Sequence, residues 1–284
     1  MINQKEVLWL VNIEIVNLVP KFLNFFELAN HEDVNESERW NLWKKHYNFA
    51  ALPPGYDQQA RKQLNQTWMR YQSNINQIRN WKPDQIKFEK SFAEVKTLLG
   101  SDKDIPLVIV FFVSSFDDSA FVAPYDEQRS MLCLPIENQL SDIIVVHELT
   151  HIVHAETASL EMNWERPIAE IVLQEGLALH VSKHLVPGER DEAYIEMGVE
   201  QGWLQSCHEH RTKILNGITP YLSESKGEVI EKFIFGTGAS SHKREAYYVG
   251  WEFVDSELKK GVSFKQLASI KPKDIPDYVK NNLK

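Results

Sequence analysis

The residues with the clearest chemical potential are two histidines and a glutamate within five positions. His147, Glu148 and His151 form a His-Glu-x-x-His segment after the apolar run at 143–146. On a helix, positions i and i+4 differ by about 40° around the axis and about 6 Å along it, so both imidazoles could bind one metal ion. Glu148 would then lie where it can take a proton from a water at that metal. The spacing predicts a catalytic site with one Zn²⁺ per chain.

The alternative is a chance match, in which these residues are only polar positions on a helix. Their neighbours argue against it, because most other residues from 143 to 153 are aliphatic. Burying a polar side chain there without a partner would cost roughly 1–3 kcal/mol each. A bound metal is the simpler explanation.

A catalytic zinc needs a third protein ligand, and two glutamates compete for that role. Glu175 lies at the centre of an apolar stripe that Ile168, Ile171 and Leu179 define at helical spacing. Glu170 lies about 155° from the centre of that stripe, on the side where a solvated carboxylate is expected. An acid within an apolar stripe is rarely left unpaired, so the pattern favours Glu175 as the ligand.

Three of the histidines that follow this segment lie near it or on the helix that contains Glu175. His154 lies on the same face as His147 and His151, one turn further along, where packing or support of a ligand is expected rather than ligation. His180 and His184 are expected to point away from the stripe that contains Glu175.

Two segments resemble a known class of enzymes. His147 to His151, followed by Gln174-Glu175-Gly176-Leu177-Ala178, resembles the gluzincin pattern of thermolysin and the zinc aminopeptidases. More closely, the chain from about residue 106 to its end resembles a bacterial family of predicted Zn-dependent proteases, recorded as a domain of unknown function. The resemblance implies a zincin-like α+β fold, with a small mixed sheet packed on the metal-binding helices. It also implies peptide hydrolysis, with zinc on His147, His151 and Glu175 and with Glu148 as general base.

In the same comparison, Tyr247-Tyr248-Val249-Gly250 resembles the Y-x-x-G segment of zinc aminopeptidases. The tyrosine of that segment donates a hydrogen bond to the oxyanion, which assigns the role to Tyr247. The other interpretation is that Tyr247 and Tyr248 belong to the core face of a helix. The Gly-Ala-Met-Glu-Asn segment that binds the substrate amine in those enzymes is absent, so exopeptidase action is not supported. The segment 120–124 could instead hold an extended peptide as an edge strand.

The remaining pattern divides the chain into a helical region at 1–104 and a zincin-like metallopeptidase domain at 105–284. The expected elements carry residues at helical spacing or continuous apolar runs. Helices are expected at 7–19, 36–49, 57–81, 83–99, 141–155 and 166–184, and strands at 106–113, 120–123 and 131–134. A Pro-Pro-Gly breaker lies within 51–55, and the aromatic residues of the first third are expected to form core.

Composition limits the class of protein. A formal charge of −9 disfavours binding to nucleic acid, and no basic patch offsets it. Cys133 and Cys207 form no C-x-x-C pair, which suits a reduced compartment, and neither a signal peptide nor a membrane span is apparent. We therefore expect a cytoplasmic protein that acts on a peptide or protein substrate, without membrane contact. The sequence leaves the oligomeric state open.

Two other functions fit the same residues. The fold could serve as a non-catalytic or regulatory peptide-binding protein, with zinc structural or lost. Alternatively, the chain could be a metal hydrolase that acts on a non-peptide substrate. Glu148 favours catalysis, because a purely structural metal site has no use for a base beside it.

Overall fold

A computed structural model describes residues 13–48, 57–116, 120–127, 129–137, 141–161 and 163–283 of the chain. These described residues form thirteen α-helices, two 3₁₀ segments and one four-stranded mixed sheet, which confirms a mostly helical α+β class. The chain divides into two compact units. The sheet unit comprises Asn12–Lys87 and Pro106–Ser141, and the helical unit comprises Phe88–Ile105 and Asp142–Lys284. The domain boundary expected between residues 104 and 105 stays a prediction.

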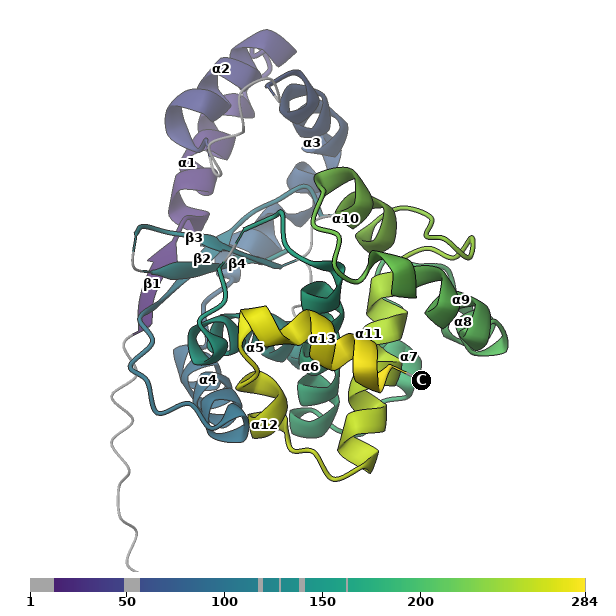
Figure 1. Ribbon diagram of the computed structural model, residues 1–284. Helices are drawn as coiled ribbons and strands as arrows, with labels where there is room; N and C mark the ends of the chain where they lie inside the picture. The colour runs from purple at the N-terminus through teal and green to yellow at the C-terminus, as the bar shows by residue number, and fades with distance from the viewer. Residues whose placement is uncertain are drawn as a thin grey trace, which may run out of the picture. The chain divides into compact units, whose positions relative to one another are not determined.

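The sheet unit is built on four strands in the order β1-β2-β4-β3 (Figure 1). β1 pairs with β2 and β2 with β4 in parallel, whereas β3 runs antiparallel to β4 at one edge. Every residue of β2 is buried, as its uninterrupted apolar sequence predicts for a central parallel strand. The strands are β1 (Ile13–Asn17), β2 (Leu107–Phe112), β3 (Phe121–Pro124) and β4 (Ser130–Pro135). The three strands expected from the sequence are confirmed, each within one residue at its ends.

The helix expected at 7–19 is wrong where the structure describes it. Residues Ile13–Asn17 are a strand, with Ile15 opposite Ile109 in the parallel ladder. The partner strand comes about 90 residues later in the chain, so no local window contains the interaction that decides this segment. Val19 then begins a helix directly after the strand.

Three helices of the sheet unit share an aromatic core. They are α1 (Val19–Ala29), α2 (Glu36–His46) and α3 (Asp57–Asn80), which Figure 1 shows grouped beside the sheet. Phe22 lies fully buried between Tyr47 and Tyr71, with ring centroids 5.3 Å and 5.0 Å apart. Trp68 packs on the same helix α1 through Phe26. This arrangement confirms that the aromatic residues of the first third are core. The breaker at 51–55 lies outside the described residues.

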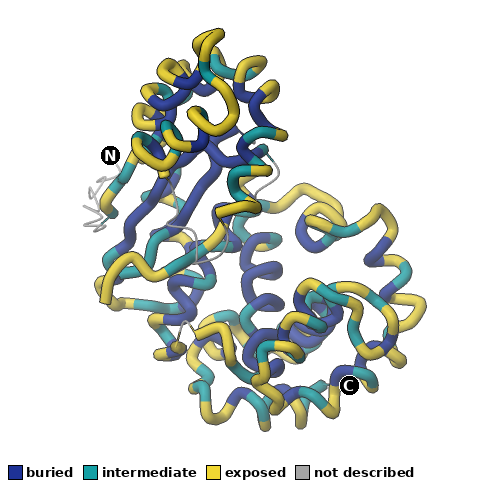
Figure 2. The backbone as a smooth tube through the Cα atoms, turned by 90° about the horizontal axis from the view of Figure 1, so that it is seen from above, coloured by how far each residue is buried: buried dark blue, intermediate teal, exposed yellow. Residues whose placement is uncertain are grey.

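The helical unit is assembled around one long buried helix, α6 (Ile168–Leu185). Its neighbours α5 (Asp142–Ala158) and α11 (Glu245–Lys259) pack along it. Buried residues form continuous dark-blue helices in the interior of this unit (Figure 2). The other elements are α4 (Gln85–Leu99), α7 (Asp191–Ile195), α8 (Trp203–Glu209), α9 (Arg211–Ile218), η1 (Thr219–Tyr221), α10 (Gly227–Ile234), α12 (Phe264–Ala268), η2 (Pro272–Asp274) and α13 (Ile275–Asn282).

Two glycines let α6 and α11 touch backbone to backbone. A Cβ on Gly176 would lie 2.1 Å from the carbonyl oxygen of Gly250, and a Cβ on Gly250 would lie 2.4 Å from that of Val172. Any side chain at either position would therefore force the helices apart. The contact therefore sets Gly176, the residue that follows Glu175, directly against Gly250 of α11.

The described residues bear on two expectations from the sequence, which concern disulfide bonds and membrane-spanning helices. Both Cys133 and Cys207 are buried and free, so neither forms a disulfide. Among the residues described, no helix combines the length and the apolar character needed to cross a membrane.

Candidate metal centre

The two histidines of the His-Glu-x-x-His segment are presented by α5. Asp142 lies in its first turn, where a negative charge is favourable beside the exposed N–H groups. The helix ends at Ala158. Ser159 follows with φ +62°, and the N–H of Leu160 donates to the carbonyl of Ala155 (2.8 Å). His147 is buried and His151 is half-buried.

The candidate third ligand comes from α6, whose first turn is anchored by a distant segment. The N–H groups of Ile168 and Ala169 donate to the carbonyls of Glu224 and Leu222, at 3.0 Å and 2.9 Å. These bonds satisfy donors that a helix start would otherwise leave unpaired. Two turns further along, the side chain of Glu175 is 8% exposed.

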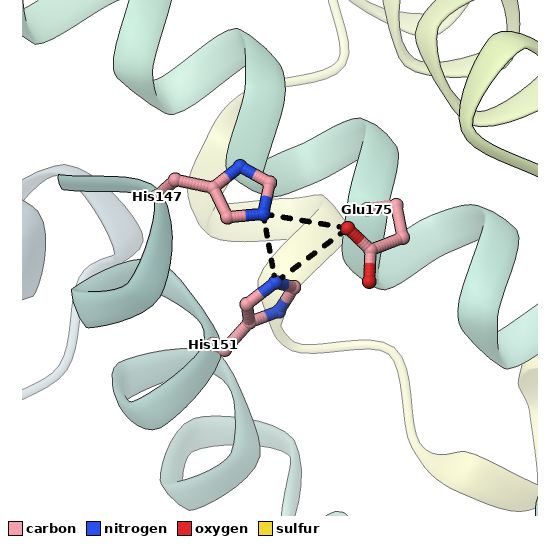
Figure 3. A group of neighbouring side chains, drawn as sticks. All are labelled: His147, His151 and Glu175. Atoms are coloured by element: carbon pink, nitrogen blue, oxygen red, sulfur yellow. Dashed lines mark hydrogen bonds and ion pairs between the residues drawn. The ribbon is translucent and has the colours of Figure 1, made fainter. Parts of the chain in front are cut away.

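The three side chains converge on one point, as Figure 3 shows. His147 Nε2 lies 3.1 Å from His151 Nε2, and Glu175 Oε2 lies 3.4 Å and 3.6 Å from these two atoms. Two donors bound at about 2.0–2.1 Å to a tetrahedral zinc lie about 3.3–3.4 Å apart. The observed triangle matches this spacing, so the group could hold a metal ion.

The state of Glu175 supports the same fit. Its Oε2 atom is buried and has no hydrogen-bond partner, although it faces both imidazoles. A buried carboxylate oxygen without a hydrogen bond is costly to retain. A cation between the three donor atoms would satisfy it. The donor set of two imidazole nitrogens and one carboxylate oxygen is typical of catalytic zinc.

The charges at the cluster reinforce one another. Burial alone would raise the pKa of Glu175, but His151 and His147 outweigh it and hold that pKa well below its usual range. Burial would likewise lower the pKa of His151, yet the carboxylates of Glu175 and Glu148 raise it instead. Glu175 is therefore ionised at neutral pH, as metal binding requires.

Glu148 has a different environment from Glu175. It is half-buried, and burial raises its pKa, with Glu175 adding to the rise and the two histidines opposing it. It does not belong to the group of converging donor atoms. A carboxylate whose pKa is raised towards neutrality is suited to accept and return a proton.

Comparison with known proteins assigns a family to these residues. A family model described as "Predicted Zn-dependent protease (DUF2268)" matches residues 118–277, more than half of the chain. The chain belongs to this family. The matched span contains His147, Glu148, His151, Glu175 and Tyr247, and it confirms the resemblance seen in the sequence. No curated protein and no solved structure shows a significant match.

The expectation that Glu170 is solvated is wrong. Glu170 is 5% exposed, and its Oε1 accepts a hydrogen bond from Gln174 Nε2 at 3.0 Å. The reason is that α6 is buried on nearly every side, so it has no solvated face opposite Glu175. Glu170 nevertheless lies outside the converging group, which contains Glu175.

His154, His180 and His184 also lie outside that group, which was found among the described residues. His154 is fully buried, neither of its ring nitrogens has a hydrogen-bond partner, and burial lowers its pKa to about 3. His180 stacks on Trp251 and hydrogen-bonds to the carbonyl of that residue at 2.9 Å. His184 packs near Phe264. These positions agree with packing roles.

The two adjacent tyrosines of α11 face different surroundings. Burial and the charge of Glu175 raise the pKa of Tyr247, and Glu148 adds to the rise, so its hydroxyl lies in the field of the cluster. The hydroxyl of Tyr248 instead lies 3.2 Å from His208 Nδ1. Burial raises the pKa of Tyr248, and the charge of Glu252 adds to the rise. Of the pair, Tyr247 is the residue whose pKa the carboxylates of Glu175 and Glu148 raise.

The structure places Arg244 against the ring of Tyr247. Its guanidinium carbon lies 3.7 Å from the ring centroid of Tyr247, and its charge partly offsets the rise in the pKa of that tyrosine. The only local signal was its position three residues before Tyr247, one turn away on a helix.

Proposed function

We propose that this chain is a zinc-dependent peptidase whose metal ligands are His147, His151 and Glu175. The observation that carries the proposal is the triangle of three donor atoms 3.1–3.6 Å apart, with a buried and unsatisfied Glu175 oxygen at one corner. Membership of a family described as predicted Zn-dependent proteases supports the same reaction.

In this proposal Glu148 is the general base. It takes a proton from the attacking water and later returns it to the amine of the leaving peptide fragment. Tyr247 donates a hydrogen bond from its hydroxyl to the oxygen that becomes negative as the carbonyl is attacked. A zinc ion, when bound, supplies Lewis-acid chemistry that makes water more acidic and polarises the carbonyl.

We further propose a zincin-like fold, a cytoplasmic location and a peptide or protein substrate. The fold proposal is supported by the order of a His-Glu-x-x-His helix followed by a Glu-Gly helix. The absence of a disulfide at the two cysteines is compatible with a reducing compartment. Catalysis is favoured over a structural zinc because, of the residues that the structure describes, three donors converge, and a four-coordinate zinc on three protein ligands keeps one position for substrate or water.

The experiment that tests the proposal is removal of the metal. Protein purified without added zinc should contain about one zinc per chain, and it should hydrolyse members of a mixed peptide library. A strong chelator should abolish hydrolysis, and stoichiometric zinc should restore it, because the ligands bind metal only as an assembled set. Full hydrolysis by metal-free protein would refute the proposed function.

Replacing Tyr247 with Phe tests the oxyanion donor. The ring and its contact with Arg244 are kept, so the substitution removes only the hydroxyl. We expect kcat to fall about 10²–10³-fold, with KM and zinc content nearly unchanged, because this hydrogen bond acts mainly in the transition state.

The matched control is Tyr248→Phe, on the residue next to Tyr247. It removes a hydroxyl that lies 3.2 Å from His208 Nδ1. It should leave kcat within a few-fold of the parent value. A large loss at Tyr248 with little change at Tyr247 would show that the donor has been assigned to the wrong tyrosine.

A further inference from the structure

Arg244 is held in a defined position at the start of α11. Its guanidinium carbon lies 3.7 Å from the centre of the Tyr247 ring, and its Nη1 donates to the carbonyl of Met197. The residue adopts φ +53°, a left-handed conformation that is costly for a side chain of this size. Stacking and hydrogen bonding therefore keep this guanidinium against the ring of Tyr247.

Among the residues that the structure describes, this guanidinium has no acidic partner. No described carboxylate lies within ion-pair distance of Arg244, whereas Arg211 in the same unit pairs with Glu252 at 2.5 Å. The absence is notable in a chain with 40 acidic side chains and a net charge of −9. A half-buried guanidinium without a counter-ion is a ready binding group for a carboxylate, whose two oxygens match its planar donors.

We propose that the substrate is a peptide with a carboxylate group that pairs with Arg244 while the bond to be cleaved lies at the metal centre. This inference rests on the proposed peptidase function and names its substrate class. The carboxylate is either the free C-terminus of the peptide or an acidic side chain beside the bond. Both sources present the same planar anion to the guanidinium, and the test below separates them.

The test measures binding without turnover. The full-length, zinc-loaded Glu148→Gln protein is immobilised and exposed to a library of N-acetylated hexapeptides. Each sequence is present as a free acid and as a C-terminal amide, and one internal position alternates between Glu and Gln. Mass spectrometry gives two ratios of retained peptides. One compares free acids with C-terminal amides, and the other compares Glu with Gln at the internal position. Arg244→Gln is added to the same background, and Arg211→Gln serves as the matched control because Glu252 already neutralises that guanidinium.

We expect peptides with a carboxylate to be retained about 10-fold or more over their amide twins, as one charge-assisted pair implies. Arg244→Gln should bring that ratio close to one and leave retention of the amide peptides and zinc content unchanged, and Arg211→Gln should keep the ratio. Preference for free acids would identify the C-terminal source, and preference for internal Glu would identify the side-chain source. Three results would overturn the inference: no preference either for free acids over C-terminal amides or for Glu over Gln, a preference that survives Arg244→Gln, or no retention of any peptide. Failure of the proposed function would appear separately, as absence of hydrolysis by the parent protein.

Discussion

Glu148→Gln should leave zinc bound while peptide turnover falls about 10²–10⁴-fold, the range expected for loss of a general base. The amide keeps the size of the side chain and its ability to hydrogen-bond, but it cannot accept a proton at neutral pH. Glu148 lies outside the group of converging donor atoms, so the three ligands stay in place. Elemental analysis and steady-state kinetics on the same preparation provide the measurement.

The matched control for this change is Glu156→Gln. Glu156 lies on the same helix, undergoes the same chemical change and is exposed. The turnover and the zinc content of the Glu156→Gln protein should both match those of the parent protein. Loss of zinc from Glu148→Gln would mean that Glu148 is itself a ligand, and its assignment as a base would fail.

Glu175→Ala should lower zinc affinity by more than the roughly 10–100-fold that loss of a supporting residue causes. The substitution removes one of the three donor atoms and leaves the imidazoles of His147 and His151 without the carboxylate 3.4–3.6 Å away. Hydrolysis at limiting zinc should be lost with the metal. A zinc titration against a competing chelator measures the affinity.

Glu170→Gln is the control that discriminates the two glutamates of α6. Glu170 is also buried, and glutamine retains an oxygen that can accept the hydrogen bond from Gln174. Zinc affinity should therefore stay close to that of the parent protein. A loss of affinity at Glu170→Gln as large as that at Glu175→Ala would reverse the assignment of the third ligand.

Some elements of the fold follow from local sequence. The aliphatic run at 106–113 predicts a buried strand, and β2 (Leu107–Phe112) is one. Helices α2 and α3 begin at the residues expected, Glu36 and Asp57. In α2 the start is encoded nearby, because Asn35 accepts hydrogen bonds from the N–H groups of Ser37 and Glu38. Signals of this kind act within a few residues and can be read without knowing the rest of the chain.

The strand β1 could not be read in the same way. Its residues become a strand by pairing with β2, whose register places Ile13 opposite Leu107. Parallel partners are necessarily separated by a long connection, so the deciding hydrogen bonds are absent from any local pattern.

The sequence by itself determined the pair of imidazoles on one helix, since His147 and His151 are separated by one helical turn. It also favoured Glu175 over Glu170, although through an expectation of a solvated helix face that the structure does not have. Only the tertiary structure decided which of the two tyrosines has a pKa raised by the carboxylates of the cluster, and that the guanidinium of Arg244 lies on the ring of that tyrosine. The physical reason is the glycine contact between Gly176 and Gly250, which sets how closely α6 and α11 approach. Such an approach depends on two segments far apart in the chain, and no spacing within either one encodes it.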